Sequence, residues 1–287
     1  MTSALRALGT VFRRELATVL RTPGYAILGF GVLLVVVGVT VVGGGGSTGI
    51  LPAVVDLLLP VEVLVPLVAV VLGYRALLTD VASGELAVIR TYPVGVVAYT
   101  LGVLLARLVA LVVLVGLPLT LVGGYVWATA SPETGIYATH AGVDSPLLFV
   151  RFLTFTLALG ASYLAVAAAV SSLAAGRRSA LALGGVVLLG GVLGGDLAVL
   201  RSLSEGGSTT ALAGAVASTP NGAFRGLVFE YVVGVAFEAG DGFVDPGRAA
   251  LTLLGWSAVG VAVAVGSLAY GRRVDAVFER VLVRFRS

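Results

Sequence analysis

Residues that could do chemistry are scarce in this chain. It has no cysteine and a single histidine, His140, which excludes thiol catalysis, zinc–cysteine sites and iron–sulfur clusters. The zinc motif H-E-x-x-H needs two histidines, and no G-x-S-x-G segment offers a nucleophilic serine. The sequence therefore predicts no catalytic residue, no metal site and no enzyme activity in this chain.

Lysine is absent as well, because all 18 basic residues are arginine. A P-loop needs the pattern G-x-x-x-x-G-K-[ST], in which the lysine reaches the β- and γ-phosphates. The glycine run at 43–48 lacks this lysine and lies between apolar segments, so it is predicted to be a flexible loop. We expect no cofactor in this chain, and ATP hydrolysis linked to it would come from another protein.

Three ionisable residues fall within or near long apolar segments, namely Glu62, Arg107 and Asp196. A charge inside a bilayer is costly, so each is a candidate for a substrate path. The alternatives are milder: Glu62 and Asp196 lie near the outer ends of their predicted helices, and Arg107 can extend its charge to the membrane surface. The two acids would suit a cation if they were neighbours, which the sequence does not decide.

The elements that position these residues are predicted to be membrane-spanning helices. Hydrophobic residues make up 58% of the chain and charged residues 11%, whereas soluble domains carry about 25% charged residues. A span needs about 20 mostly apolar residues. Six segments qualify, at 25–42, 57–78, 98–126, 147–173, 179–197 and 249–270. The predicted fold class is an all-α integral membrane protein with a single transmembrane domain over 1–287.

Arginine placement predicts the orientation of these helices. Cytoplasmic segments of membrane proteins are enriched in basic residues. With the N-terminus inside, thirteen arginines fall in cytoplasmic segments and four in outer segments. The four outer ones are Arg151, Arg201, Arg225 and Arg248. We therefore expect a multi-pass protein of the cell membrane with both termini in the cytoplasm.

The segment before the first span, 3–22, is predicted to be a basic amphipathic helix. Its apolar residues share one arc of a helical wheel: Leu5, Leu8, Phe12, Leu16 and Val19. Arginines that include Arg13, Arg14 and Arg21 lie on the other side. This pattern favours an elbow helix in the cytoplasmic interface. The alternative is a charged tail that merely obeys the arginine bias.

The long outer connection between spans five and six contains a further apolar helix. Thr219 is a suitable N-cap, and Pro220 suits the first helical position. A helix over 220–238 could count as a seventh span, but this would place the C-terminal arginines outside. We therefore predict an outer re-entrant hairpin over 210–238, with the helix paired to the shorter segment 210–217.

A polar segment between spans two and three is the best candidate for a partner contact. Asp80 or Ser83 is predicted to cap a short helix, and Glu85 suits its first turn. The candidate contact residues are Asp80, Gly84, Glu85, Leu86, Arg90 and Pro93. The alternative is an ordinary cytoplasmic loop shaped by packing at the membrane surface.

The same segment carries a family resemblance. The run DVASGEL at 80–86, followed by Pro93 and Gly102, resembles the first cytoplasmic loop of type-2 ABC transporter permeases. The elbow sequence FRREL at 12–16 is similar too, and it looks close to the permeases of transporters that mature the copper site of nitrous-oxide reductase. The chain departs from the usual pattern at Gly95, Val96 and Val103.

This resemblance implies a function. The chain would be the membrane subunit of an ATP-driven exporter, working with a second permease copy in membrane lipid and without nucleic acid. Cytoplasmic ATPase subunits would bind ATP and Mg²⁺ and push on the loop at 80–93, and the outer hairpin would act as a gate. The alternative is a secondary transporter or channel, which predicts paired charges deep in the bundle and often an internal repeat. A further alternative is an intramembrane enzyme or a cofactor-binding anchor.

Overall fold

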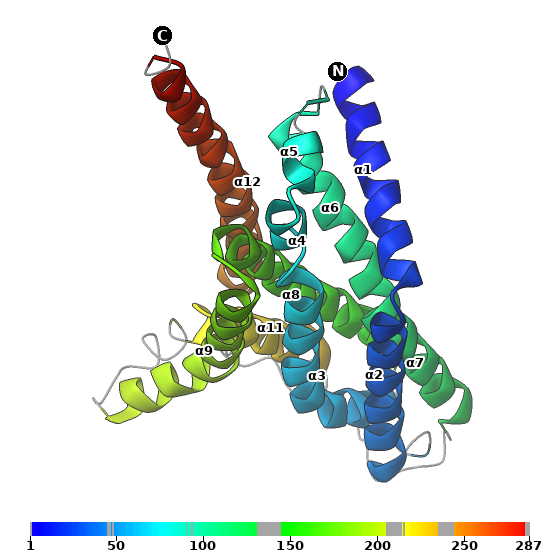
Figure 1. Cartoon of the computed structure of the whole chain (residues 1–287). Helices are drawn as coiled ribbons and strands as arrows, with labels where there is room; N and C mark the ends of the chain where they lie inside the picture. Colours follow the sequence, from blue (N-terminus) through cyan, green and yellow to red (C-terminus); the bar gives the residue numbers. More distant parts are fainter. Residues whose placement is uncertain are drawn as a thin grey trace.

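The computed structural model describes residues 2–44, 47, 49–89, 91–92, 94–130, 145–204, 214, 216–234 and 244–284. All regular structure within these ranges is helical. Six helical stretches are long and apolar enough to cross a membrane, which confirms the predicted all-helical, six-span class (Figure 1). They are Pro23–Val42, Ile50–Ala82, Val96–Thr129, Pro146–Leu173, Arg177–Arg201 and Pro246–Tyr270.

The described elements follow a simple order along the chain. They are α1 (Thr2–Arg21), α2 (Pro23–Val42), α3 (Ile50–Gly73), α4 (Leu78–Ala82), α5 (Glu85–Ile89), α6 (Val96–Leu111), the π-turn η2 (Val112–Gly116), α7 (Leu117–Thr129), α8 (Pro146–Leu173), α9 (Arg177–Ser204), α11 (Pro220–Val228), the π-turn η3 (Phe229–Val233) and α12 (Pro246–Arg284). The first residue of α1 and the last of α12 lie at the same end of the molecule as α4 and α5 (Figure 1).

Helix α8 is the centre of the bundle, because it packs against both α3 and α12. Glycines allow these helices to approach closely. A Cβ atom at Gly260 would lie 2.5 Å from the backbone of Ala165, and one at Gly73 would lie 2.5 Å from the Cβ of Ala167. Small residues at such crossings bring backbones into direct contact, which favours helix association in a membrane.

The N-terminal helix α1 is formed by nearly all of the predicted elbow segment, and it packs along α6 (Figure 1). Its buried face is formed by Val11, Glu15 and Val19, whereas Leu5 is exposed. The face is therefore rotated from the predicted apolar arc, because Glu15 is buried through an ion pair. The predicted position of α1 in the membrane interface remains a prediction.

Two helices are longer than predicted, which changes the position of two candidate residues. Helix α3 begins at Ile50 rather than at 57, so Glu62 lies twelve residues into it, about 18 Å from its start. The prediction that Glu62 lies near the end of its helix was wrong. Helix α9 continues to Ser204, so Asp196 also lies inside a helix and not at its end.

The polar segment after α3 forms two short helices, α4 and α5, instead of the one predicted. Gly84 separates them with a φ of 75°, a left-handed conformation that glycine adopts without strain. The hydroxyl of Ser83 accepts a hydrogen bond from the backbone N–H of Glu85, as a cap does. Asp80 lies inside α4, so of the two predicted caps Ser83 is the one that makes this contact. Arg90 and Pro93 lie outside the described residues.

The predicted start of the re-entrant helix is confirmed. Thr219 accepts a hydrogen bond from the N–H of Gly222, and Pro220 occupies the first turn. Helix α11 and η3 are described as far as Val233, and almost every side chain of α11 is buried. Most of the segment 210–217 and all of 235–238 lie outside the described residues. The re-entrant hairpin thus remains a prediction.

Candidate functional site

Two polar networks join helices within the apolar bundle. The first, here called the N-terminal network, is formed by Arg14, Glu15, Tyr25, Asp80, Glu85, Tyr99 and Arg107. The second, here called the α11 network, is formed by Glu62, Tyr163, Asp196, Asn221 and Arg225. Together they contain all three of the predicted intramembrane charges.

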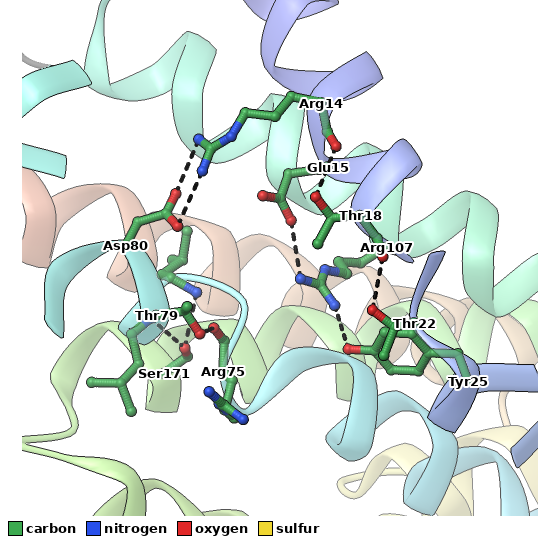
Figure 2. A network of polar contacts seen from close by, with 12 residues as sticks. Arg14, Glu15, Thr18, Thr22, Tyr25, Arg75, Thr79, Asp80, Arg107 and Ser171 are labelled. Carbon is green, nitrogen blue, oxygen red and sulfur yellow. Dashed lines mark hydrogen bonds and ion pairs between the residues drawn. The ribbon is translucent and has the colours of Figure 1, made fainter. Parts of the chain in front are cut away.

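In the N-terminal network, the buried carboxylate of Asp80 ties α4 to α6 and α1. The Tyr99 hydroxyl donates to it at 2.6 Å. The Arg14 guanidinium is farther away, at 3.4 Å, and Figure 2 shows this contact. Arg14 makes its shorter contact, 2.6 Å, with Glu85 of α5. Burial lowers the pKa of Arg14, but Asp80 and Glu85 outweigh this effect, so its pKa is raised overall. Arg14 therefore stays charged and holds α1 beside both short helices.

A second part of the same network is an ion pair between α1 and α6. One Arg107 nitrogen lies 3.0 Å from the Glu15 carboxylate, and the other donates to the Tyr25 hydroxyl at 2.6 Å (Figure 2). The guanidinium carbon also lies 5.7 Å from the centre of the Tyr25 ring, within reach of a cation–π contact. Arg107 is only 8% exposed. Its burial comes from contacts within the protein, so the extension of Arg107 to the membrane surface stays a prediction.

These contacts assign Arg107 and Arg14 to the joining of helices. Of the predicted elbow arginines, only Arg14 takes part, since Arg13 and Arg21 are exposed. A third connection comes from α8, where the Ser171 hydroxyl accepts hydrogen bonds from the N–H groups of Leu77 and Leu78, both at 3.0 Å (Figure 2). The two short helices are thus fixed to α1, α6 and α8.

The outward surface of the short helices is largely apolar. Val81, Val88 and Tyr92 are exposed, and the side chain of Glu85 is 48% exposed. Leu86 is buried and anchors α5 to the core. The three exposed apolar residues were not among the predicted contact residues. The signal available in the sequence was the position of these apolar residues in a short segment that also carries charged residues.

The α11 network brings Glu62 and Asp196 together, which the sequence did not show. Arg225 binds the Glu62 carboxylate through two nitrogens, at 2.8 and 2.5 Å, and donates to Asp196 at 2.9 Å. Glu62 is only 5% exposed, whereas the Asp196 side chain is 53% exposed. A bidentate arginine–carboxylate pair is among the strongest polar contacts in proteins. Arg225, predicted only as an outer-loop arginine, is thus the residue that links both acids.

The backbone of α3 takes part in this network as well. The carbonyl of Glu62 would normally accept from the N–H of residue 66, but residue 66 is a proline and has none. The Asn221 side chain of α11 donates to this carbonyl at 2.9 Å, and it accepts from the Tyr163 hydroxyl at 2.6 Å. The sequence held a signal for this site, because a proline four residues after Glu62 frees its carbonyl.

Glycines in α9 make room for these contacts. A Cβ atom at Gly191 would collide with the Tyr163 hydroxyl, and one at Gly195 would lie 2.7 Å from the Thr219 hydroxyl. Within the described residues, no group of three or more His, Cys, Asp or Glu side chains is placed to hold a metal ion. The contacts of both networks join helices to one another.

Comparisons with known proteins give one informative result. No family model matches the chain. The chain is similar to the probable ABC transporter permease protein NosY of Pseudomonas aeruginosa, with 30% identity over 181 residues. The match covers 60% of this chain and 62% of that protein, so the chain spans less than two thirds of its relative. The resemblance to an ABC transporter permease is thereby confirmed, and with six spanning helices the chain is a multi-pass membrane protein.

Proposed function

We propose that this chain is the membrane-spanning subunit of an ATP-driven ABC transporter, most simply an exporter. The similarity to NosY carries the proposal, because that relative is described as a probable ABC transporter permease. The absence of lysine fits it, since a chain without a P-loop depends on a separate ATPase. ATP and Mg²⁺ would be bound by that partner.

The surface for the ATPase is the outward side of α4 and α5. Val81, Val88 and Tyr92 would enter the partner, and the exposed carboxylate of Glu85 would set its orientation. A push on this surface would reach α1 and α6 through Asp80, which is bonded to Tyr99. The candidate coupling site is formed by five residues, which are Asp80, Val81, Glu85, Val88 and Tyr92.

The rest of the assembly follows from the same proposal. A second copy of the permease would complete the transport pathway in the cell membrane, with both termini in the cytoplasm. The segment around α11 would close the pathway on the outer side. The start of α1 and the end of α12 lie at the same end of the molecule as α4 and α5 (Figure 1). This position supports the proposed arrangement.

Co-purification tests the proposal. The tagged chain is extracted from native membranes in mild detergent, and its partners are identified by mass spectrometry. We expect an ATPase with a P-loop in near-stoichiometric amount. Transport by the chain alone in vesicles, with no response to ATP, would contradict the proposal.

A matched pair of variants locates the contact. Tyr92→Ala removes an exposed ring beside α5, and Tyr125→Ala removes one of similar exposure near the end of α7. We expect Tyr92→Ala to reduce ATPase recovery several-fold and Tyr125→Ala to leave it unchanged. Equal recovery with both variants would remove α5 from the interface.

A secondary transporter is the second candidate, and one observation favours it. The buried pair Glu15–Arg107 and the buried carboxylate of Glu62, paired with Arg225, are charges of the kind that ion-driven transporters hold within their bundles. Measurement of proton and sodium dependence in vesicles without ATP separates the two candidates. A flux that follows an imposed ion gradient would favour this alternative.

A further inference from the structure

Helix α11 is fastened by side chains from three different spans. Its Asn221 and Arg225 are four residues apart and therefore share one face of the helix. Glu62 of α3 binds both residues, through its carbonyl and its carboxylate. Tyr163 of α8 and Asp196 of α9 complete the contacts. Apart from these hydrogen bonds and ion pairs, α11 is held mainly by apolar packing. We therefore attribute the position of α11 in the bundle to its polar contacts.

Both ties to α3 meet at a weak point of that helix. Pro66 lies inside α3 and removes the hydrogen bond that would support the Glu62 carbonyl. Helices bend most readily at prolines, because one rung of the hydrogen-bond ladder is missing there. Asn221 replaces the missing donor from outside the helix. Pro60 also lies inside α3, but it is the carbonyl freed by Pro66 that Asn221 binds. Glu62 therefore both anchors α11 and lies at the bend point that Pro66 creates.

We propose that Glu62, Asn221 and Arg225 form a latch that keeps α11 seated in the bundle and opens when α3 bends at Pro66. The proposal deepens the proposed function and rests on it for the source of the motion. Beyond Pro66, α3 leads directly into the turn before α4, which Ser171 holds. A push on α4 would thus bend α3 at Pro66, carry the Glu62 carbonyl away from Asn221 and release α11.

The latch makes a prediction that needs neither substrate nor ATPase. The chain has no cysteine, so Ala223→Cys places a single thiol on the fully buried face of α11. The rate at which this thiol reacts with a small thiosulfonate reagent reports how often α11 moves away from its packed position and exposes the thiol. Adding Glu62→Gln removes the charge that Arg225 binds, and we expect the rate to rise about ten-fold or more.

The matched control is Glu230→Gln, which makes the same chemical change in η3 outside the latch. We expect this control to leave the reaction rate unchanged. The proposal is overturned if Glu62→Gln leaves the thiol protected, or if Glu230→Gln exposes it equally. A second thiol, from Ala168→Cys in the core of α8, distinguishes release of α11 from general loosening. It should stay protected in Glu62→Gln, and its exposure there would also overturn the proposal.

The proline supplies a sharper test. Asn221→Ala leaves the Glu62 carbonyl without a donor and should raise the labelling of the α11 thiol several-fold. Pro66→Ala restores a backbone N–H at the position that can bond this carbonyl. We therefore expect Pro66→Ala to suppress most of the effect of Asn221→Ala. If the two changes act independently, the carbonyl has no part in the latch.

These measurements are independent of the proposed function. Labelling is done on the full chain in its membrane without any partner, so failure to recover an ATPase does not affect it. If an ATPase is recovered but the thiol at position 223 behaves alike in all variants, the latch alone is wrong. If the latch holds and no ATPase is found, only the source of the motion changes.

Discussion

At the scale of single residues, the buried Arg107 joins helices through its contacts. Arg107 has an acid on another helix, Glu15, and a tyrosine hydroxyl, Tyr25. An arginine in the low dielectric of the bundle costs several kcal/mol unless a carboxylate neutralises it. Each residue of such a pair thus depends on the other, which explains why Glu15 can lie beside Val11 and Val19 on the buried face of α1.

Removal of one charge tests this dependence. Glu15→Gln leaves Arg107 buried and unpaired, which should lower the free energy of unfolding by about 3–5 kcal/mol. Thermal unfolding of the purified chain in detergent measures the loss. Arg13→Gln, on an exposed position of the same helix, serves as control and should stay within about 0.5 kcal/mol of the parent. A loss of the same size in both variants would mean that the ion pair contributes nothing.

At the scale of elements, glycines decide which helices touch. Two of the glycines in helix α12, Gly255 and Gly260, have different surroundings. A Cβ atom at Gly260 would lie 2.5 Å from the backbone of α8, whereas one at Gly255 has no neighbour within 4 Å. Both glycines lie in mostly apolar segments of the same helix, and the packing partner distinguishes them.

Valine substitutions at these two glycines form a matched pair. Gly260→Val should separate α8 from α12 and cost about 1–3 kcal/mol through overpacking. Gly255→Val should be tolerated, because its side chain would face outward. Unfolding in a denaturant series compares the two variants. An unchanged stability of Gly260→Val would show that these helices are not in close contact.

At the scale of the whole molecule, both chain ends and the short helices α4 and α5 share one end of the bundle (Figure 1). The arginine bias predicts that this end faces the cytoplasm. The connection after α2 then faces outward. This orientation decides which side a partner ATPase can reach.

Single cysteines report the orientation directly. We expect Ser47→Cys to react with a membrane-impermeant maleimide in intact cells, and Ser287→Cys to react only after permeabilisation. The absence of native cysteine removes any background. The reverse pattern would place α4 and α5 outside and exclude a cytoplasmic ATPase as their partner.

The sequence by itself determined the class of the molecule, its six spans and the cap at Thr219, because these depend on apolar length and on local backbone chemistry. It also indicated the resemblance to ABC permeases through residues that are near one another in the chain. It did not show that Arg225 joins Glu62 to Asp196, or that Asn221 supports the carbonyl freed by Pro66. These partners are 159 or more residues away from Glu62 or approach from another helix. Hydropathy fixes which helices enter the membrane, but side-chain packing fixes which faces meet, and only the tertiary structure decided that.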